Sequence, residues 1–211
     1  MEGDLSPEGM RDIVAAVVQS RSLYELQLWG NERAPGACVA HVLASSSLRV
    51  LSLHHNALDD AGVASLCAGL VRHTALTALY LGNNCIGDAG AARIAHALAG
   101  NTSLAHLGLS VNRVGDDGAC ALAGLVRTNS TLRSLYLSWN KINDAGGRAL
   151  LHALDANRVL GQLLLTGNDI DVALGYVIEE ATRLPRRRIS QAPPGDGDAV
   201  RAAAHAVVAN A

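Results

Sequence analysis

The chain has 211 residues, of which 17 are basic and 19 are acidic, so its formal net charge at neutral pH is −2. Hydrophobic residues make up 49% of the chain but aromatic residues only 3%, and there is no Phe. Any core must therefore be filled by Leu, Ile, Val and Ala. A charge this close to zero removes the strongest electrostatic reason for binding nucleic acid or a membrane surface, so we expect neither as a partner.

The N-terminal segment predicts a helix and no targeting signal. Its first residues are acidic and lack a positively charged region, so we expect no secretory signal and a cytoplasmic location. The apolar run from Ile13 to Val18 is too short to span a bilayer. Residues 9–23 align with residues 62–76, a later helical segment, so the chain is expected to open with a capping helix that has no strand before it.

Beyond this helix the sequence repeats itself every 28 residues. Each copy begins with the pattern L-x-x-L-x-L-x-x-N, and a first copy at Leu23 lies only 25 residues before the next. In all six copies every Leu and every Asn of the pattern is present. The five regular copies begin at Leu48, Leu76, Leu104, Leu132 and Leu160. A sequence of this kind predicts an architecture in which each unit packs on its neighbours.

Within each copy we predict a strand, a turn and a helix. The alternating Leu residues are typical of a strand with one buried face. An Asp then recurs where the helix should begin, so we expect it to be the N-cap, and a Gly two residues later indicates close approach to the strand layer. These residues are Asp60, Asp88, Asp116 and Asp144, with Gly62, Gly90, Gly118 and Gly146. The inner stripe of the helices is expected to be Leu66, Ile94, Leu122 and Leu150, followed one turn later by Leu70, Leu98, Val126 and Leu154.

These units predict an α/β solenoid with a curved, parallel inner sheet and outer helices. Strands that are joined through helices must be parallel, with right-handed crossovers. Strands stack at about 4.8 Å and helices at about 10 Å, so the stack has to curve with the strands inside. We also expect the recurring Asn side chains to form a ladder that bonds the backbone of the turns. They are Asn31, Asn56, Asn84, Asn112, Asn140 and Asn168.

The copies resemble the leucine-rich repeat in its 28-residue form, as in ribonuclease inhibitor and the sensing end of Nod-like receptors. The resemblance implies a leucine-rich repeat solenoid of about six repeats with helical caps, over about residues 8–184. Its last helix is expected to contain residues 174–181. Residues 185–211 are expected to form a linker and a short helix over 199–209.

The first copy departs from this pattern. Pro35 and Gly36 stand where its helix should begin, and Arg33 replaces the aliphatic residue of the other copies. We therefore expect a shorter helix near residues 38–44.

The sequence contains no motif for catalysis, a cofactor or a metal. Lys141, the single Lys, is not part of a G-x-x-x-x-G-K-[ST] phosphate loop. Zinc could be held by the side chains of Cys38, His41, His54 and His55. However, the first two belong to an outer helix and the last two to an inner strand, so the module geometry separates them. We predict a non-enzymatic chain without cofactor or metal.

Three smaller motifs are interpreted as structural. Without a secretory signal, the four cysteines are expected to be reduced and packed. The glycosylation motifs at Asn101 and Asn129 are interpreted as loop residues. The three Arg residues at 186–188 are interpreted as a solvated linker, with a nuclear address as the alternative.

A partner is expected to bind the concave face of the sheet. Counting the first Leu of each copy as position one, positions three, five and seven project from this face, and positions four and six enter the core. The candidate partner-binding residues are Trp29, His54, Tyr80, His106, Tyr136 and Trp139. The small Gly82, Gly108 and Ser110 are expected to leave a shallow hollow between anchoring rings. Family habit and β-propensity are an alternative explanation for the same aromatic residues.

The resemblance implies a monomeric protein–protein interaction module with a protein partner of unknown identity. The alternative is a regulator of a small GTPase, similar to Ran GTPase-activating protein, a family expected to carry an acidic C-terminal tail and a functional loop Arg. Here the tail is not acidic, and Arg113 is the only loop Arg in a regular copy. A relative of Nod-like receptors without the nucleotide-binding domain also stays open, and it too would be a binding module.

Overall fold

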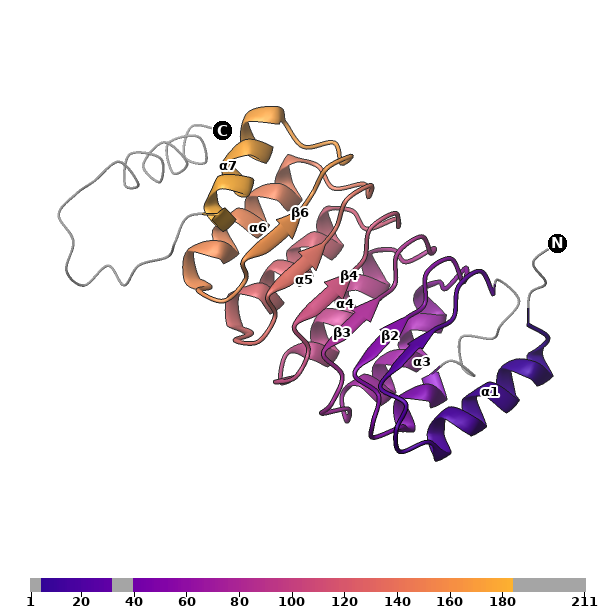
Figure 1. The fold of residues 1–211 in the computed structure, drawn as a ribbon. Coiled ribbons are helices and arrows are strands. Elements are labelled where there is room, and N and C mark those ends of the chain that lie inside the picture. The colour runs from indigo at the N-terminus through magenta and orange to yellow at the C-terminus, as the bar shows by residue number, and fades with distance from the viewer. Residues whose placement is uncertain (1–4, 32–39, 184–211) are drawn as a thin grey trace.

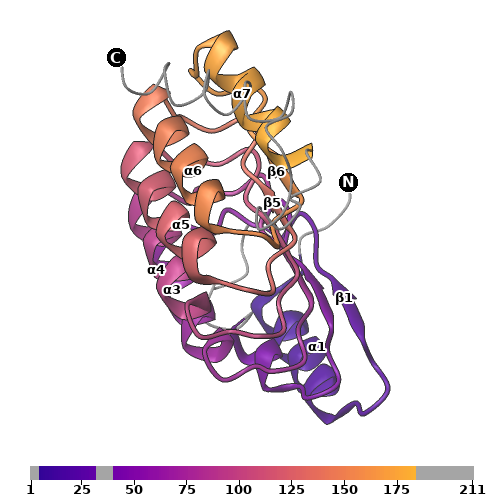
Figure 2. The same ribbon diagram turned by 90° about the vertical axis from the view of Figure 1, so that its left-hand side faces the viewer.

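The strands that the structure describes form one parallel sheet. The computed structural model describes residues 5–31 and 40–183. Within them, six strands follow one another in chain order across the sheet, and the helices line its other side (Figures 1 and 2). The strands are β1 (Glu25–Gln27), β2 (Val50–Ser52), β3 (Ala78–Tyr80), β4 (His106–Gly108), β5 (Ser134–Tyr136) and β6 (Gln162–Leu164). The predicted α/β solenoid is confirmed.

The helices follow the predicted order. Four of them fill the gaps between the regular strands, namely α3 (Asp60–Leu70), α4 (Asp88–Leu98), α5 (Asp116–Thr128) and α6 (Asp144–Ala156). At the two ends lie α1 (Pro7–Gln19) and α7 (Val172–Arg183). In the irregular first copy, Ala40 is helical and the 3-10 helix η1 (His41–Ala44) follows it, which agrees with a shorter helix there. Cys38, Arg33, Pro35 and Gly36 lie outside the described residues.

The core is formed by equivalent residues of successive repeats. Strands pair in register, so that Leu107 lies between Leu79 and Leu135 at the same position of the adjacent repeats. All three side chains are fully buried, and the predicted inner stripe of the helices is buried as well. A sequence period therefore becomes a column of stacked Leu side chains, which places the alternate strand residues on the opposite face of the sheet.

The predicted Asn ladder is present. Asn112 illustrates it: its amide nitrogen donates to the carbonyl oxygens of Leu81 at 2.9 Å and Leu109 at 3.1 Å, and its amide oxygen accepts from the backbone N–H of Ile86 at 3.0 Å. Asn84 and Asn140 make equivalent bonds. Each side chain thus satisfies buried backbone groups of two repeats at once.

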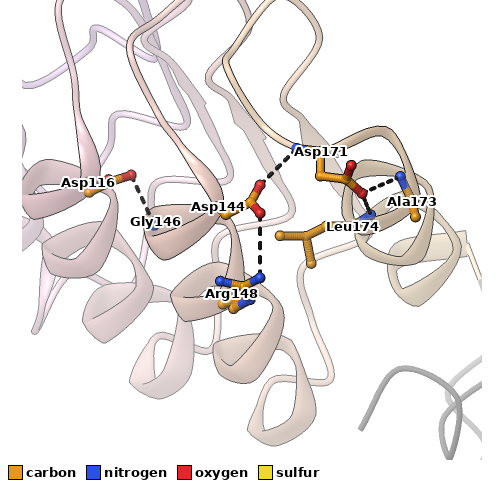
Figure 3. A network of polar contacts seen from close by, with 7 residues as sticks. All are labelled: Asp116, Asp144, Gly146, Arg148, Asp171, Ala173 and Leu174. Atoms are coloured by element: carbon orange, nitrogen blue, oxygen red, sulfur yellow. Dashed lines mark hydrogen bonds and ion pairs between the residues drawn. The ribbon is translucent and has the colours of Figure 1, made fainter. Parts of the chain in front are cut away.

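The prediction that the recurring Asp residues are N-caps of their own helices is wrong. Each of them is the first residue of its helix, and its carboxylate accepts hydrogen bonds from the start of the next helix. Asp88 Oδ1 accepts from the N–H groups of Gly115 at 2.6 Å and Gly118 at 2.9 Å. Asp116 binds Gly146 in the same way (Figure 3). Stacking brings the unpaired N–H groups of one helix onto the preceding repeat, so the cap comes from that repeat.

Gly90, Gly118 and Gly146 lie against the carboxylate of the preceding repeat and not against the strand layer, which corrects the second expectation for these three residues. A Cβ atom on Gly118 would lie 2.6 Å from Asp88 Oδ1 and 2.8 Å from a methyl group of Val114. Gly90 and Gly146 are equally crowded by Asp60 and Asp116. Only glycine lets the carboxylate of one repeat reach the helix of the next.

The series of caps donated from one repeat to the next ends at the last described repeat. Asp144 still accepts from the N–H of Asp171 at 2.7 Å, but Val172 and Leu174 replace the usual Asp and Gly. Asp171 instead caps its own helix through the N–H groups of Ala173 and Leu174 (Figure 3).

The loop interpretation of the two glycosylation motifs gains a specific structural reason. Asn129 is buried, and its side chain bonds the carbonyl oxygens of Leu98 and Asn101 and the N–H groups of Thr131 and Leu132. This Asn belongs to a second ladder, at the turns between helix and strand. Its other members include His73, Asn101 and Asn157.

Candidate binding surface

The face of the sheet that looks away from the helices carries the candidate residues. We call it the sheet face and define it by positions three, five and seven of the six strands. Trp29, His54, Tyr80, His106 and Tyr136 occupy such positions, whereas Trp139 follows at position eight, on the turn after β5.

Three of the six candidates form a continuous row of rings. The ring centroids of Trp29 and His54 are 5.7 Å apart with an interplanar angle of 84°. Those of His54 and Tyr80 are 6.1 Å apart at 14°, a stacked arrangement. The indole N–H of Trp29 donates to the hydroxyl oxygen of Ser52 at 2.8 Å. These contacts fix the orientation of the rings before any partner is bound.

The expected hollow at Gly82 and Gly108 is absent, because rings already fill it. A Cβ atom on Gly82 would lie 2.6 Å from two atoms of the His54 ring, and one on Gly108 would lie 2.9 Å from Cδ1 of Tyr80. Each ring leans across the glycine of the following strand. The glycines therefore support the rings and do not separate them.

The other three candidates lie further along the stack. His106 is half-buried on β4. The hydroxyl of Tyr136 donates to Oε1 of Gln162 at 3.1 Å. Trp139 is 65% exposed, and its ring lies over Gly167, where a Cβ atom would come within 2.6 Å of Cδ2. In the part of the chain that the structure describes, the ring contacts join Trp29, His54 and Tyr80 and include none of these three candidates.

Position eight, which follows the strand, was not foreseen as special. All six residues there have a positive φ, a conformation that is rare for Val and Trp. They are Gly30, His55, Asn83, Val111, Trp139 and Gly167. The N–H groups of Val111 and Trp139 each donate at 2.8 Å to a carbonyl oxygen of the next repeat, which holds this turn. Gly30, Gly167 and Asn83 are residue types that favour a positive φ, so their recurrence at position eight could have indicated this conformation from the sequence.

The sheet face carries very little charge. Among its eighteen positions Glu25 is the only Asp, Glu, Lys or Arg, and its carboxylate accepts from the side-chain amide of Gln27 at 2.6 Å. Burial raises the pKa of Tyr80, with further contributions from Tyr136 and Glu25.

Several other predictions concern residues away from this face. Cys67 is buried and Cys85 half-buried, but Cys120 is exposed, so the expectation of packed thiols is wrong for Cys120. All three are free thiols. Arg113 is exposed on the loop after Asn112.

Residues 5–31 and 40–183 contain no group of three or more His, Cys, Asp or Glu side chains arranged to hold a metal ion. In the same ranges, none of the helices combines the length and apolarity needed to cross a membrane.

The comparisons with known proteins agree on the fold. The model of the family described as leucine rich repeat matches residues 44–67, 72–95, 100–123 and 128–151. The solved structure of the actin-binding site 2 of leiomodin-1 is similar, with a TM-score of 0.60 and 16% identity over 73% of this chain and 90% of that one. The C-terminal domain of tropomodulin from Caenorhabditis elegans has a TM-score of 0.50 and 12% identity over 84% of this chain and 92% of that one. No curated protein sequence matches significantly. From the matched repeats, the register of the strands and these folds, we conclude that the chain is a leucine-rich repeat protein.

Proposed function

We propose that this chain is a non-enzymatic protein-interaction module that binds a protein partner through the sheet face of its solenoid. The observation that carries the proposal is the set of aromatic side chains on an otherwise small and nearly uncharged surface. Aromatic anchors among small residues are typical of the energetic centres of protein interfaces.

The support of the rings favours binding with little rearrangement. His54, Tyr80 and Trp139 each lean on the glycine of the next repeat, and Trp29 is held by its hydrogen bond to Ser52. Side chains that are ordered before binding lose less conformational entropy when the complex forms. The parallel backbone below them makes the surface rigid, so we expect the monomer to bind with a preformed face.

The similar solved structures include a repeat domain that binds a protein, but they do not identify a partner for this chain. The name of the leiomodin-1 fragment describes it as an actin-binding site. This agrees with a repeat fold that serves protein recognition, while an identity of 16% carries the fold alone to this chain.

The proposal is tested with a partner captured from a lysate by the full chain and identified by mass spectrometry. Binding of the purified partner is then measured for Tyr136→Ala and Trp139→Ala. We expect each to weaken binding by at least about 1–2 kcal/mol, because the ring is an interface anchor. The matched controls are Arg93→Glu and Arg127→Glu, which change exposed side chains on the outer helices α4 and α5.

Circular dichroism of all four variants should remain native. If the outer-helix variants lose the partner while both aromatic variants keep it, the sheet face is not the binding surface. The aromatic residues would then reflect the strand preference of such side chains.

A further inference from the structure

We propose that the turns after β4 and β5 bind an acidic segment of the protein partner, with its carboxylates on Arg113 and Lys141 and an apolar side chain against Val111 and Trp139. We call these four residues the rim patch, because they follow the two strands at the edge of the sheet face. The inference rests on the proposed function and adds the chemistry of the partner.

The two cationic side chains of the rim patch belong to adjacent turns. The backbone N–H of Lys141 donates to the carbonyl oxygen of Val114 at 2.8 Å, and Val114 directly follows Arg113 in the chain. The backbones of the two turns therefore lie about 4.8 Å apart, at the spacing of neighbouring strands. Both cations are exposed. Like charges on adjacent repeats repel each other, so an anion bound between them relieves the repulsion.

Neither cation is neutralised within the part of the chain that the structure describes. There, Arg113 and Lys141 form no ion pair and no side-chain hydrogen bond. Asp116 and Asp144, at the starts of the helices that follow these turns, accept hydrogen bonds from the next repeat. Asp169 is exposed at the equivalent position beside Lys141 but is not paired with it. The two positive charges are thus available to a partner.

The apolar members of the rim patch are exposed as well, Val111 to 46% and Trp139 to 65%. The N–H of Val111 donates at 2.8 Å to the carbonyl oxygen of Ser138, the residue before Trp139, so these side chains also come from adjacent turns. Their φ angles are 57° and 58°, a conformation that is rare for Val and Trp. Exposed apolar side chains on a backbone that disfavours them are typical of a functional site.

The combination of an apolar side chain and a cation is confined to these two repeats. At the position of the cations, the other regular copies carry Ala57, Cys85 and Asp169. At the position of the apolar side chains, the other copies carry Gly, His or Asn, and the side chains of His55 and Asn83 are joined to each other at 2.8 Å. Because the sheet face beside the patch is nearly uncharged, the two cations decide which charge a partner can bring there.

Two cations next to apolar side chains favour an acidic peptide over a nucleic acid. Binding of nucleic acid depends on the neutralisation of several phosphates, and the chain has a formal net charge of −2. A peptide can place carboxylates on both cations and an apolar side chain on the indole of Trp139 at the same time.

Trp139 reports directly on binding at the rim patch. The chain has two Trp residues, so Trp29→Phe leaves Trp139 as the single indole fluorophore. This parent protein is titrated at low ionic strength with four probes: a capped Glu-Glu-Leu-Glu-Glu peptide, its neutral Gln-Gln-Leu-Gln-Gln analogue, a Glu-Glu-Gly-Glu-Glu peptide and an oligothymidylate of equal charge. We expect a saturable change in emission with the acidic Leu peptide, weaker binding of the Gly peptide and the oligothymidylate, and none of the neutral peptide.

Variants of the same parent identify the side chains that bind. Arg113→Gln and Lys141→Gln should each weaken binding of the acidic Leu peptide by about twofold to fivefold. Arg113→Lys, which keeps the charge, should retain most of the binding. The matched controls Arg93→Gln and Arg127→Gln remove exposed cations from the outer helices α4 and α5 and should leave the affinity unchanged. Thermal unfolding of each variant verifies that the fold is intact.

Val111→Asn separates binding from stability. Asn83 occupies the same position of the preceding repeat, and Asn tolerates a positive φ, so the thermal midpoint should not fall. Loss of the apolar side chain should still weaken binding of the acidic Leu peptide by about twofold to threefold. A lower midpoint with unchanged binding would remove Val111 from the site.

Two results overturn the inference: equal affinity for the acidic and the neutral Leu peptides, or equal affinity of the parent and the double variant Arg113→Gln/Lys141→Gln. Binding of the oligothymidylate as tight as that of the acidic Leu peptide overturns the choice of a peptide. With the captured partner, loss of binding in Tyr80→Ala or Tyr136→Ala but not in the double variant leaves the proposed function standing and rejects the rim patch. Full binding in the double variant and in every sheet-face variant rejects the proposed function itself.

Discussion

Leu107 shows how a single side chain is buried by two neighbouring repeats. It is fully buried in the middle of the sheet, between Leu79 and Leu135. We expect Leu107→Ala to lower the free energy of unfolding by about 2–5 kcal/mol, because the lost methyl groups leave a cavity that stacked repeats cannot close. Ser110→Ala, on the half-buried sheet face, should cost less than about 0.5 kcal/mol. Equal urea midpoints for the two variants would show that the assigned register is wrong.

Cys67 and Cys120 should differ sharply in reactivity. Burial raises the pKa of the Cys67 thiol from 9.0 to about 11, against a smaller opposing effect of Arg93. The thiolate, which is the reactive form, is therefore suppressed in Cys67, while Cys120 is exposed. In native protein we expect iodoacetamide to modify Cys120 and to leave Cys67 unmodified, as measured by peptide mass spectrometry. Labelling of Cys67 without unfolding would contradict its burial.

The raised pKa of Cys67 also makes the stability of the protein depend on pH. Since the folded state holds the Cys67 proton more tightly than the unfolded chain, unfolding releases protons between the two pKa values. The contribution of Cys67 to stability is complete below about pH 9 and is lost as the pH rises to about 11. Cys67→Ala should flatten this part of the stability profile, as measured by urea unfolding at several pH values. An unchanged slope would assign the alkaline loss to other groups.

At the scale of one element, α5 contains two glycines with opposite roles. A Cβ atom on Gly118 would meet Asp88 Oδ1 at 2.6 Å, whereas one on Gly124 would meet nothing within 4 Å. We expect Gly118→Ala to destabilise the protein by about 1–3 kcal/mol through overpacking. Gly124→Ala should stabilise it by about 0.5–1 kcal/mol, because Ala is the better helix former. Thermal unfolding of both variants measures the difference.

The contrast between Gly118 and Gly124 cannot be predicted from the sequence, because it depends on how the helices are capped. The positions of the helices follow from the 28-residue period, and Asp88 was correctly placed at the start of α4. Its role depends on a hydrogen bond to Gly115, 27 residues later, which exists only after the repeats have stacked. If Gly118→Ala instead stabilised the protein, the carboxylate of Asp88 would not be held against Gly118.

At the scale of the whole molecule, the described core ends with α7. Leu174 and Ile178 are the last buried residues of the hydrophobic core among those that the structure describes. Residues 185–211 lie outside the described residues, so the linker and the helix over 199–209 stay predictions. From the sequence Pro193-Pro194-Gly195 and the absence of a repeat, we expect removal of residues 186–211 to leave the thermal midpoint nearly unchanged. A large fall would mean that this segment packs on the solenoid.

The sequence by itself determined the architecture and the face on which each residue of the repeated strands lies. The alternation around Leu51, Leu79 and Leu107 assigns one side of each strand to the core, because side chains on a strand point to opposite faces in turn. The same rule placed Trp29, His54 and Tyr80 on one surface. Their use by a partner stays a prediction that the variants above test.

Only the tertiary structure decided how one repeat contacts the next. The capping of α5 by Asp88, the seat of the Tyr80 ring on Gly108 and the positive φ of Trp139 all involve groups about 28 residues apart in the chain. The sequence of one repeat does not show which side chain of the adjacent repeat packs on a given residue. A glycine looks the same in the sequence whether the space beside it is empty, as at Gly124, or occupied, as at Gly108. The predicted hollow on the sheet face failed for this reason: stacking at the spacing of adjacent strands places each ring over the following glycine.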